Sequence, residues 1–233
     1  MSEQQTIFAC PNQNDVVIQN VGIENTAVLI IDNYCQDITS IYNDVSQHAN
    51  FKKEANTSYP GIRAKMFPDY GQELIMHAEG IIRKHFSIDS DLKADPISAF
   101  YSIVSTEEHD LTQIQTIPHY DGINTHSFAI MHYISAGNFG GTGFFRHETT
   151  GYENIDITRV VHYKEEKTQA HSHEYVTSST SDYQLIHQVD YKVNRLVIYP
   201  GTLLHSGLIN KKTDIYRENG TPRLTANIGL QFI

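Results

Sequence analysis

The stretches Phe128-Ala129-Ile130-Met131-His132-Tyr133-Ile134 and Thr142-Gly143-Phe144-Phe145-Arg146-His147 are short apolar and aromatic runs separated by glycine-rich sequence. Runs of this length and composition between turn residues favour β-strands. The same texture extends from about residue 97 to the C-terminus. We predict strands at residues 98–105, 112–118, 126–134, 142–147, 157–163, 184–191, 194–199, 203–208 and 223–232. Many short strands are typical of a sandwich or barrel, and these suffice for an eight-stranded jelly roll.

The first half of the chain predicts one buried strand and two helices. Residues 26–32 (TAVLIID) form an apolar run of strand length. One helix should begin near Asp37, whose carboxylate can cap it, and another should span about 69–85. The apolar positions recur at helical spacing, namely Ile38, Ile41, Tyr42 and Val45, then Leu74, Ala78, Ile81, Ile82 and His85.

We therefore predict an α+β, mainly β fold, a double-stranded β-helix (jelly roll) with supporting N-terminal helices. Residues 1–233 should form a single domain, because no linker-like segment divides the chain. Within it, about 1–97 would be the helical support region and about 98–233 the jelly-roll core. The helices should cover the outside of one sheet, which leaves a polar site between the two sheets.

Composition excludes several classes of function. The chain has 27 acidic and 17 basic residues, a net charge of −10, so a general nucleic-acid-binding surface is not expected. It has no apolar run near membrane-spanning length, and its first residues lack the basic start of a secretion signal. We expect a cytoplasmic protein without a membrane partner. Cys10 and Cys35 are too few for a disulfide framework, so both should be reduced thiols.

Two histidines and an aspartate predict a metal site. His119 and Asp121 lie two positions apart in the segment 118–122 (PHYDG), and alternate side chains of a strand point the same way. His205 lies in an apolar stretch, where an unpaired imidazole is costly. Two imidazoles and one carboxylate on one octahedral face suit Fe(II) and leave positions for a co-substrate and O2. The competing interpretation is a hydrogen-bonded loop pair and a core histidine.

Arg223 and Thr225 predict a carboxylate-binding site on the last strand. They are two positions apart in Arg223-Leu224-Thr225, so the guanidinium and the hydroxyl share a face. Arginine offers a fork that binds a carboxylate at two points. A dicarboxylate co-substrate that chelates a metal at its other end would need such a pair. The competing interpretation of Arg223 is a surface ion pair.

In the order of these elements the chain resembles the Fe(II)/2-oxoglutarate-dependent dioxygenases, prolyl-hydroxylase-like branch. The resemblance covers about residues 98–233. It rests on the HxD pair, the aromatic strand 128–134, Gly140-Gly141-Thr142-Gly143-Phe144-Phe145, His205-Ser206-Gly207 and the Arg-x-Thr strand. The Gly-Gly-Thr order departs slightly from the family pattern. Phe145-Arg146-His147 also resembles a segment of an uncharacterised bacterial subfamily.

The resemblance implies roles for individual residues. His119, Asp121 and His205 would be the catalytic iron ligands, and Arg223 would bind the distal carboxylate of 2-oxoglutarate. Thr225 and Tyr133 would donate further hydrogen bonds to it, and Tyr101 would line the same region. The segment between His205 and Arg223 is longer than in the family. Residues 209–221 therefore look like an inserted loop, and Arg217 within it is the fallback candidate.

The resemblance also constrains the reaction. Halogenases of this superfamily replace the carboxylate ligand, so a retained Asp121 favours hydroxylation, or a related desaturation or ring closure. 2-Oxoglutarate and O2 would be consumed, succinate and CO2 released, and the substrate would be a small molecule, amino acid or peptidyl residue. The sequence does not indicate which substrate, nor the oligomeric state.

Two alternatives use other chemistry. His171-Ser172-His173, with Glu174 or His187, could form a cupin-like metal site without 2-oxoglutarate, although a polar loop fits the spacing better. A non-catalytic binding domain of the same fold is the other alternative. The presence of all three expected metal ligands argues against a non-catalytic domain. The Arg-x-Thr pair argues against the cupin-like site.

Overall fold

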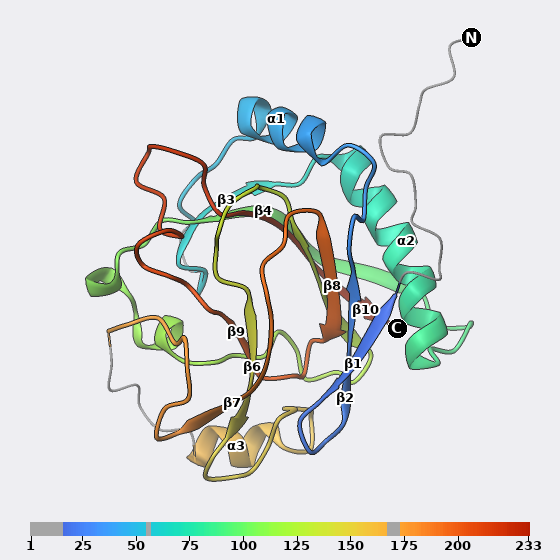
Figure 1. Cartoon of the computed structure of the whole chain (residues 1–233). Helices are drawn as coiled ribbons and strands as arrows, with labels where there is room; N and C mark the ends of the chain where they lie inside the picture. Colours follow the sequence, from blue (N-terminus) through green and yellow to red (C-terminus); the bar gives the residue numbers. More distant parts are fainter. Residues whose placement is uncertain (1–15, 55–56, 167–172) are drawn as a thin grey trace.

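Antiparallel β-strands dominate the computed structural model, which describes residues 16–54, 57–166 and 173–233. In chain order the elements are β1 (Val17–Val21), β2 (Thr26–Ile31), α1 (Ile38–His48), β3 (Gly61–Lys65), α2 (Pro68–Phe86), β4 (Ala94–Val104), η2 (Glu108–Asp110), η3 (Gln113–Thr116), β5 (Ser127–Tyr133), β6 (Thr142–His147), α3 (Val160–Glu166), β7 (Tyr183–Val189), β8 (Arg195–Pro200), β9 (His205–Gly207) and β10 (Leu224–Phe232). Figure 1 shows their arrangement, with α1 and α2 at the periphery.

The strands form two sheets. The larger has seven strands in the order β1-β2-β8-β5-β10-β4-β3, and the smaller has three in the order β7-β6-β9. All the named strand pairs are antiparallel. With helices on one side, this arrangement confirms the predicted α+β, mainly β jelly roll.

Alternation along the strands of the larger sheet divides its side chains between two cores. On β5, Phe128 and Ile130 pack against α1 and α2, whereas Ala129 and Tyr133 face the smaller sheet. Phe144 of β6 joins the second group, which lies between the two sheets. Because successive side chains of a strand point to opposite faces, each strand serves both cores.

The two predicted helices are confirmed. Asp37 caps α1 and accepts a hydrogen bond from the Ser40 backbone N–H at 2.9 Å. α2 begins at Pro68, a position where the missing N–H of proline has no cost. Both bury their apolar faces in the core on the outer side of the larger sheet, as predicted.

Two predicted strands are wrong. Within 112–118 a short 3₁₀ helix forms at Gln113–Thr116, because Thr112 and Gln115 make a reciprocal capping box. Within 157–163 the helix α3 forms instead, since Asp156 accepts hydrogen bonds from the backbone of Thr158 and Arg159 and starts a helical turn. Local side-chain bonds to the backbone thus outweigh the apolar pattern.

The sequence prediction also omitted the edge strands β1 and β3. Val17 and Ile18 on β1 are about half exposed, and β3 is short, so neither strand has a strong burial pattern.

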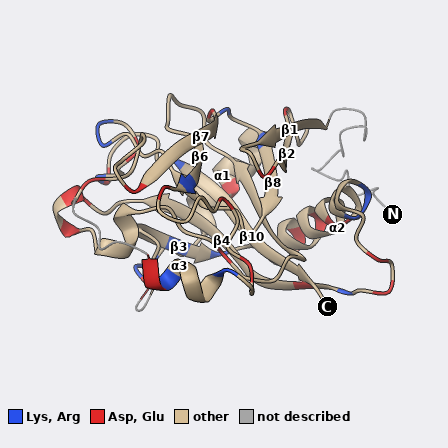
Figure 2. Ribbon diagram, turned by 90° about the horizontal axis from the view of Figure 1, so that it is seen from below, with Lys and Arg blue, Asp and Glu red and all other residues tan. Residues whose placement is uncertain are grey.

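Cys35 is a free, buried thiol, whereas Cys10 lies outside the described residues. Among the described residues, none of the helices combines the length and apolarity that a membrane crossing requires. The chain has 27 acidic and 17 basic residues, and Figure 2 marks those in the described part of the ribbon.

Candidate metal centre

His119 and His205 are held together by their own backbones. The N–H of His119 donates to the carbonyl of His205 at 2.9 Å, and the N–H of His205 donates to the carbonyl of His119 at 2.8 Å. This isolated antiparallel bridge joins the segment before Asp121 to the start of β9. The two imidazole centroids are consequently 4.3 Å apart.

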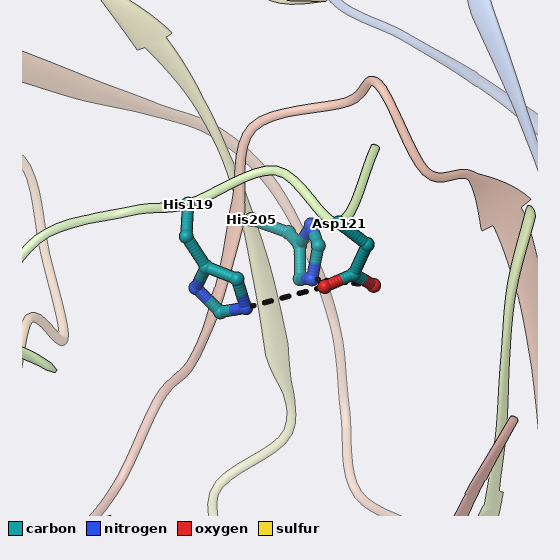
Figure 3. A group of neighbouring side chains, drawn as sticks. All are labelled: His119, Asp121 and His205. Atoms are coloured by element: carbon teal, nitrogen blue, oxygen red, sulfur yellow. Dashed lines mark ion pairs between the residues drawn. The ribbon is translucent and has the colours of Figure 1, made fainter. Parts of the chain in front are cut away.

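Asp121 completes the group from the same segment. Its backbone N–H donates to the carbonyl of Gly201 at 2.8 Å, which fixes the turn. Its Oδ1 lies 3.8 Å from Nε2 of His119, and its Oδ2 lies 3.6 Å from Nε2 of His205. One donor atom from each of the three residues lies within 4.8 Å of the others, and the side chains point toward one another in Figure 3.

The donor set fits a divalent iron ion. Nδ1 of His205 bonds the carbonyl of Leu203 at 2.8 Å, so Nδ1 carries the proton and Nε2 keeps a lone pair for a metal. Adjacent ligands of an octahedral ion with bonds near 2.1 Å are about 3 Å apart, so these donors, which lie within 4.8 Å of one another, would move closer together on binding it. His205 is buried, while His119 and Asp121 are about half exposed, so one side of the group faces solvent.

Arg223 is buried just before β10. Its Nε donates to the carbonyl of Gly140 at 2.9 Å and lies 3.7 Å from Oδ2 of the buried Asp214. Its guanidinium lies over the rings of Tyr133 and Tyr191, at 5.8 and 5.5 Å from their centroids. The surface ion pair considered from sequence is therefore wrong, because Arg223 is only 4% exposed.

Thr225 and Tyr133 lie opposite each other on neighbouring strands. They are paired in register between β10 and β5, and both are buried. Tyr133 faces the smaller sheet, and its hydroxyl bonds Oγ1 of Thr142 at 2.7 Å. Burial raises the pKa of Tyr133, although Arg223 opposes this, so the phenol keeps its proton and can donate it in a hydrogen bond.

The structure corrects the expectation for Tyr101. Its ring packs against Phe67 and Tyr70 on the helix side of the larger sheet, the face opposite to Tyr133. Tyr101 therefore does not line the region around Arg223. The fallback residue Arg217 lies at the surface, where it forms an ion pair with Glu107, so the structure gives it no place beside Arg223.

Two residues that lie at this site, Tyr199 and Asp214, were not identified from the sequence. Tyr199 on β8 is buried, and its ring lies edge-on to His205 with centroids 4.8 Å apart. Burial raises its pKa, a rise that the charge of Asp121 strengthens and that of Arg223 opposes. Strand alternation along β8 could have indicated Tyr199. Asp214 gave no signal, because it lies in polar loop sequence.

The alternative metal site gains no support. His171 and Ser172 lie outside the described residues, and His187 instead bonds Gln19 at 2.7 Å. Over the described ranges, the group His119, Asp121 and His205 is the one in which three such side chains come close enough to hold a metal ion.

Solved structures with the same fold include metal enzymes. HygX from Streptomyces hygroscopicus with nickel and 2-oxoglutarate bound matches with a TM-score of 0.54 at 9% identity, covering 89% of this chain and 84% of HygX. HygX with nickel, 2-oxoglutarate and hygromycin B bound matches with a TM-score of 0.52 at 10% identity, with the same coverage. SnoN, a non-heme alpha-ketoglutarate-dependent epimerase from nogalamycin biosynthesis, matches at 0.51 and 7% identity, covering 89% and 79%.

These similarities establish the class of fold: a jelly roll shared with 2-oxoglutarate-dependent non-haem metal enzymes. The chain belongs to the family described as "Family of unknown function (DUF6445)", whose model matches residues 12–230. No curated protein matches the chain.

Proposed function

We propose that the protein is an Fe(II)- and 2-oxoglutarate-dependent dioxygenase that hydroxylates a small molecule, an amino acid or a peptidyl residue. The observation that carries this proposal is the meeting of His119, Asp121 and His205 within 4.8 Å. The fold similarity to HygX and SnoN supports the general class. The whole chain would act as one oxygenase unit in the cytoplasm, with no nucleic-acid or membrane partner.

The three clustered side chains would hold iron through Nε2 of His119, one carboxylate oxygen of Asp121 and Nε2 of His205. Nδ1–H of His205 stays bonded to the carbonyl of Leu203, which fixes the orientation of the ring and leaves Nε2 as the donor atom. Asp121 contributes one negative charge and leaves the remaining positions on iron to the co-substrate and O2.

Arg223 would bind the distal carboxylate of 2-oxoglutarate, because it is a buried cation on the inner side of the fold. Thr225 and Tyr133 would add neutral donors at the same place, and Tyr199 would lie beside the iron ligand His205. Charge-assisted hydrogen bonds in a buried site are stronger than neutral ones, so Arg223 should dominate co-substrate affinity.

When bound, Fe(II) with 2-oxoglutarate and O2 supplies the oxidising power to replace a substrate C–H bond by C–OH, with release of succinate and CO2. The protein contributes position, since it must bring one C–H bond to the metal and keep others away. The exposed side of His119 and Asp121 is the route by which a substrate would reach the centre.

The test is anaerobic addition of Fe(II) and then 2-oxoglutarate, followed by visible absorption. We expect a weak charge-transfer band that needs both additions and that Asp121→Ala lacks. Succinate release across a panel of metabolites and peptides, with mass spectrometry for a gain of one oxygen, then identifies the product. Metal binding without the band would favour the cupin-like alternative, and no metal binding would favour a non-catalytic domain.

A further inference from the structure

A second arginine faces the interior side of the larger sheet. Arg63 on β3 pairs in register with Ser102 on β4, and Ser102 pairs with Thr225 on β10. Cross-strand partners point to the same face of a sheet. Ile62 and Ala64, the neighbours of Arg63, pack instead on the helix side. Arg63 therefore shares a face, and one cross-strand row, with the proposed co-substrate residues.

Two aromatic rings hold the Arg63 guanidinium in place. Its Cζ lies 4.8 Å from the centroid of the Tyr59 ring and 5.1 Å from that of Phe100. Arginine packed against rings is pre-oriented and loses less entropy when it binds a planar anion. The exposed fraction of its side chain is 23%, so solutes can reach part of the group.

The hydrogen-bonding capacity of Arg63 is not filled. Its Nε is a buried atom without a hydrogen-bond partner among the residues that the structure describes. The only ion pair found for Arg63 among these residues is a long one, 3.7 Å from Nη1 to Oε2 of Glu54. Buried donors are normally satisfied, so Nε of Arg63 has room for a hydrogen-bond acceptor from a ligand.

Two lysines share the strand face of Arg63 in a chain that is acidic overall. Lys52 forms an isolated bridge with Arg63, and Lys65 lies two positions along β3, so both share its face and both are exposed. Glu54 is the acidic side chain paired with Arg63. In a protein with net charge −10, three cations on one strand face favour an anionic ligand there.

The site is separate from that of the co-substrate carboxylate. Two strand spacings, about 10 Å, lie between the backbones of Arg63 and Thr225. Burial raises the pKa of Tyr59, which contacts Arg63, to about 12, and the charges of Arg223 and Arg63 both oppose that rise. One small dicarboxylate on Arg223 and iron would leave Arg63 for a different anion.

Building on the proposed function, we propose that Arg63, supported by Lys52 and Lys65, binds a carboxylate or phosphate group of the prime substrate. The substrate would then be an acidic small molecule or a residue beside an acidic group. Glu54 holds the guanidinium when substrate is absent, and the incoming anion displaces it.

The direct test follows the side-chain Nε–Hε resonance of Arg63 by NMR during titration with inorganic phosphate, assigned by its loss in Arg63→Lys. We expect a saturable change in the chemical shift of this resonance. Phosphate should bind at least threefold more tightly to Glu54→Gln, which lacks the competing carboxylate. Arg159 is the internal control, since it lies over the Tyr152 ring but its ion pair with Glu24 is closed at 2.7 Å. No shift at Arg63, or equal shifts at both arginines, would overturn the inference.

A second arm separates this inference from the proposed function. With Zn(II) and 2-oxoglutarate bound, the Arg63 response to phosphate should persist; its loss would mean that the co-substrate occupies Arg63. In succinate-release assays, candidate substrates that carry an acid group should be turned over in preference to their methyl esters. Arg63→Gln should raise the KM for the acidic substrate at least tenfold and leave the KM for 2-oxoglutarate unchanged. Neutral preferred substrates would refute the assignment. A missing Fe(II)–2-oxoglutarate band would refute the proposed function alone.

Discussion

Asp214 and Arg223 form a buried ion pair in which Oδ2 and Nε are 3.7 Å apart. Both side chains are almost completely inaccessible. The same Oδ2 accepts hydrogen bonds from the backbone N–H of Gly140, at 2.9 Å, and of Asn210, at 3.1 Å. The loop that looked like an insertion in the sequence thus supplies the counter-charge of Arg223 and fixes its position.

Asp214→Asn should lower the free energy of unfolding by about 2 to 4 kcal/mol, because it leaves the buried guanidinium without its counter-ion. We expect 2-oxoglutarate to restore more stability to this variant than to the wild type, since its carboxylate would replace the lost charge. Urea denaturation with and without 2-oxoglutarate and Zn(II) measures both effects. An unchanged denaturation midpoint would show that Asp214 does not support Arg223.

Arg223→Ala should raise the 2-oxoglutarate concentration required for activity much more than it changes iron affinity. Loss of a buried charge-assisted pair costs about 2 to 5 kcal/mol, which is more than tenfold in affinity. Arg217→Ala is the matched control, because Arg217 lies at the surface with Glu107. The measurement is the activity of both variants as 2-oxoglutarate is titrated at saturating Fe(II). A larger defect in Arg217→Ala would mean that Arg217, in the loop 209–221, binds the distal carboxylate of 2-oxoglutarate.

His119→Ala, Asp121→Ala and His205→Ala should each abolish turnover and weaken Fe(II) binding. The fold should survive, because the core of the jelly roll is apolar and does not depend on a metal. Circular dichroism and iron titration test this directly. Asp121→Gly should likewise lose hydroxylation. Full activity in any of these variants would remove that residue from the site.

His132 should make stability depend on pH. It is fully buried, Nε2–H donates to Oδ1 of Asn194 at 3.1 Å, and Nδ1 accepts from the Tyr70 hydroxyl at 2.7 Å. Burial lowers the pKa of His132 to about 4, although Asn194 opposes this. Between about pH 6.5 and 4 the unfolded chain therefore binds one more proton than the folded one.

The contribution of His132 to stability is accordingly complete above pH 6.5 and is lost as the pH falls toward 4. Over that window the loss should reach about 3 kcal/mol. His132→Gln keeps a neutral polar side chain and should lack this part of the pH dependence, even if it is less stable at pH 7. The measurement is the difference in unfolding free energy between wild type and variant across the window. A constant difference would contradict the prediction.

Elements with a periodic pattern of apolar residues could be predicted from the sequence. The apolar spacing of α1 and α2, and most strands after residue 97, could be predicted because burial of one face imposes a period on the chain. The pair His119 and Asp121 was visible for the same reason, as two positions on one side of an extended segment. The predictions for 112–118 and 157–163 were wrong where capping side chains satisfied a local helical turn.

Which strand faces meet depends on how the sheets and helices pack, and the sequence pattern does not show it. A period of two shows that Tyr101 and Ser102 point to opposite sides of β4, but it does not show which side the helices cover. The packing of α2 placed Tyr101 away from Arg223 and placed Ser102 and Arg63 toward the interior. The contact of His205 with His119 likewise depends on backbone hydrogen bonds between distant segments, which no local pattern encodes.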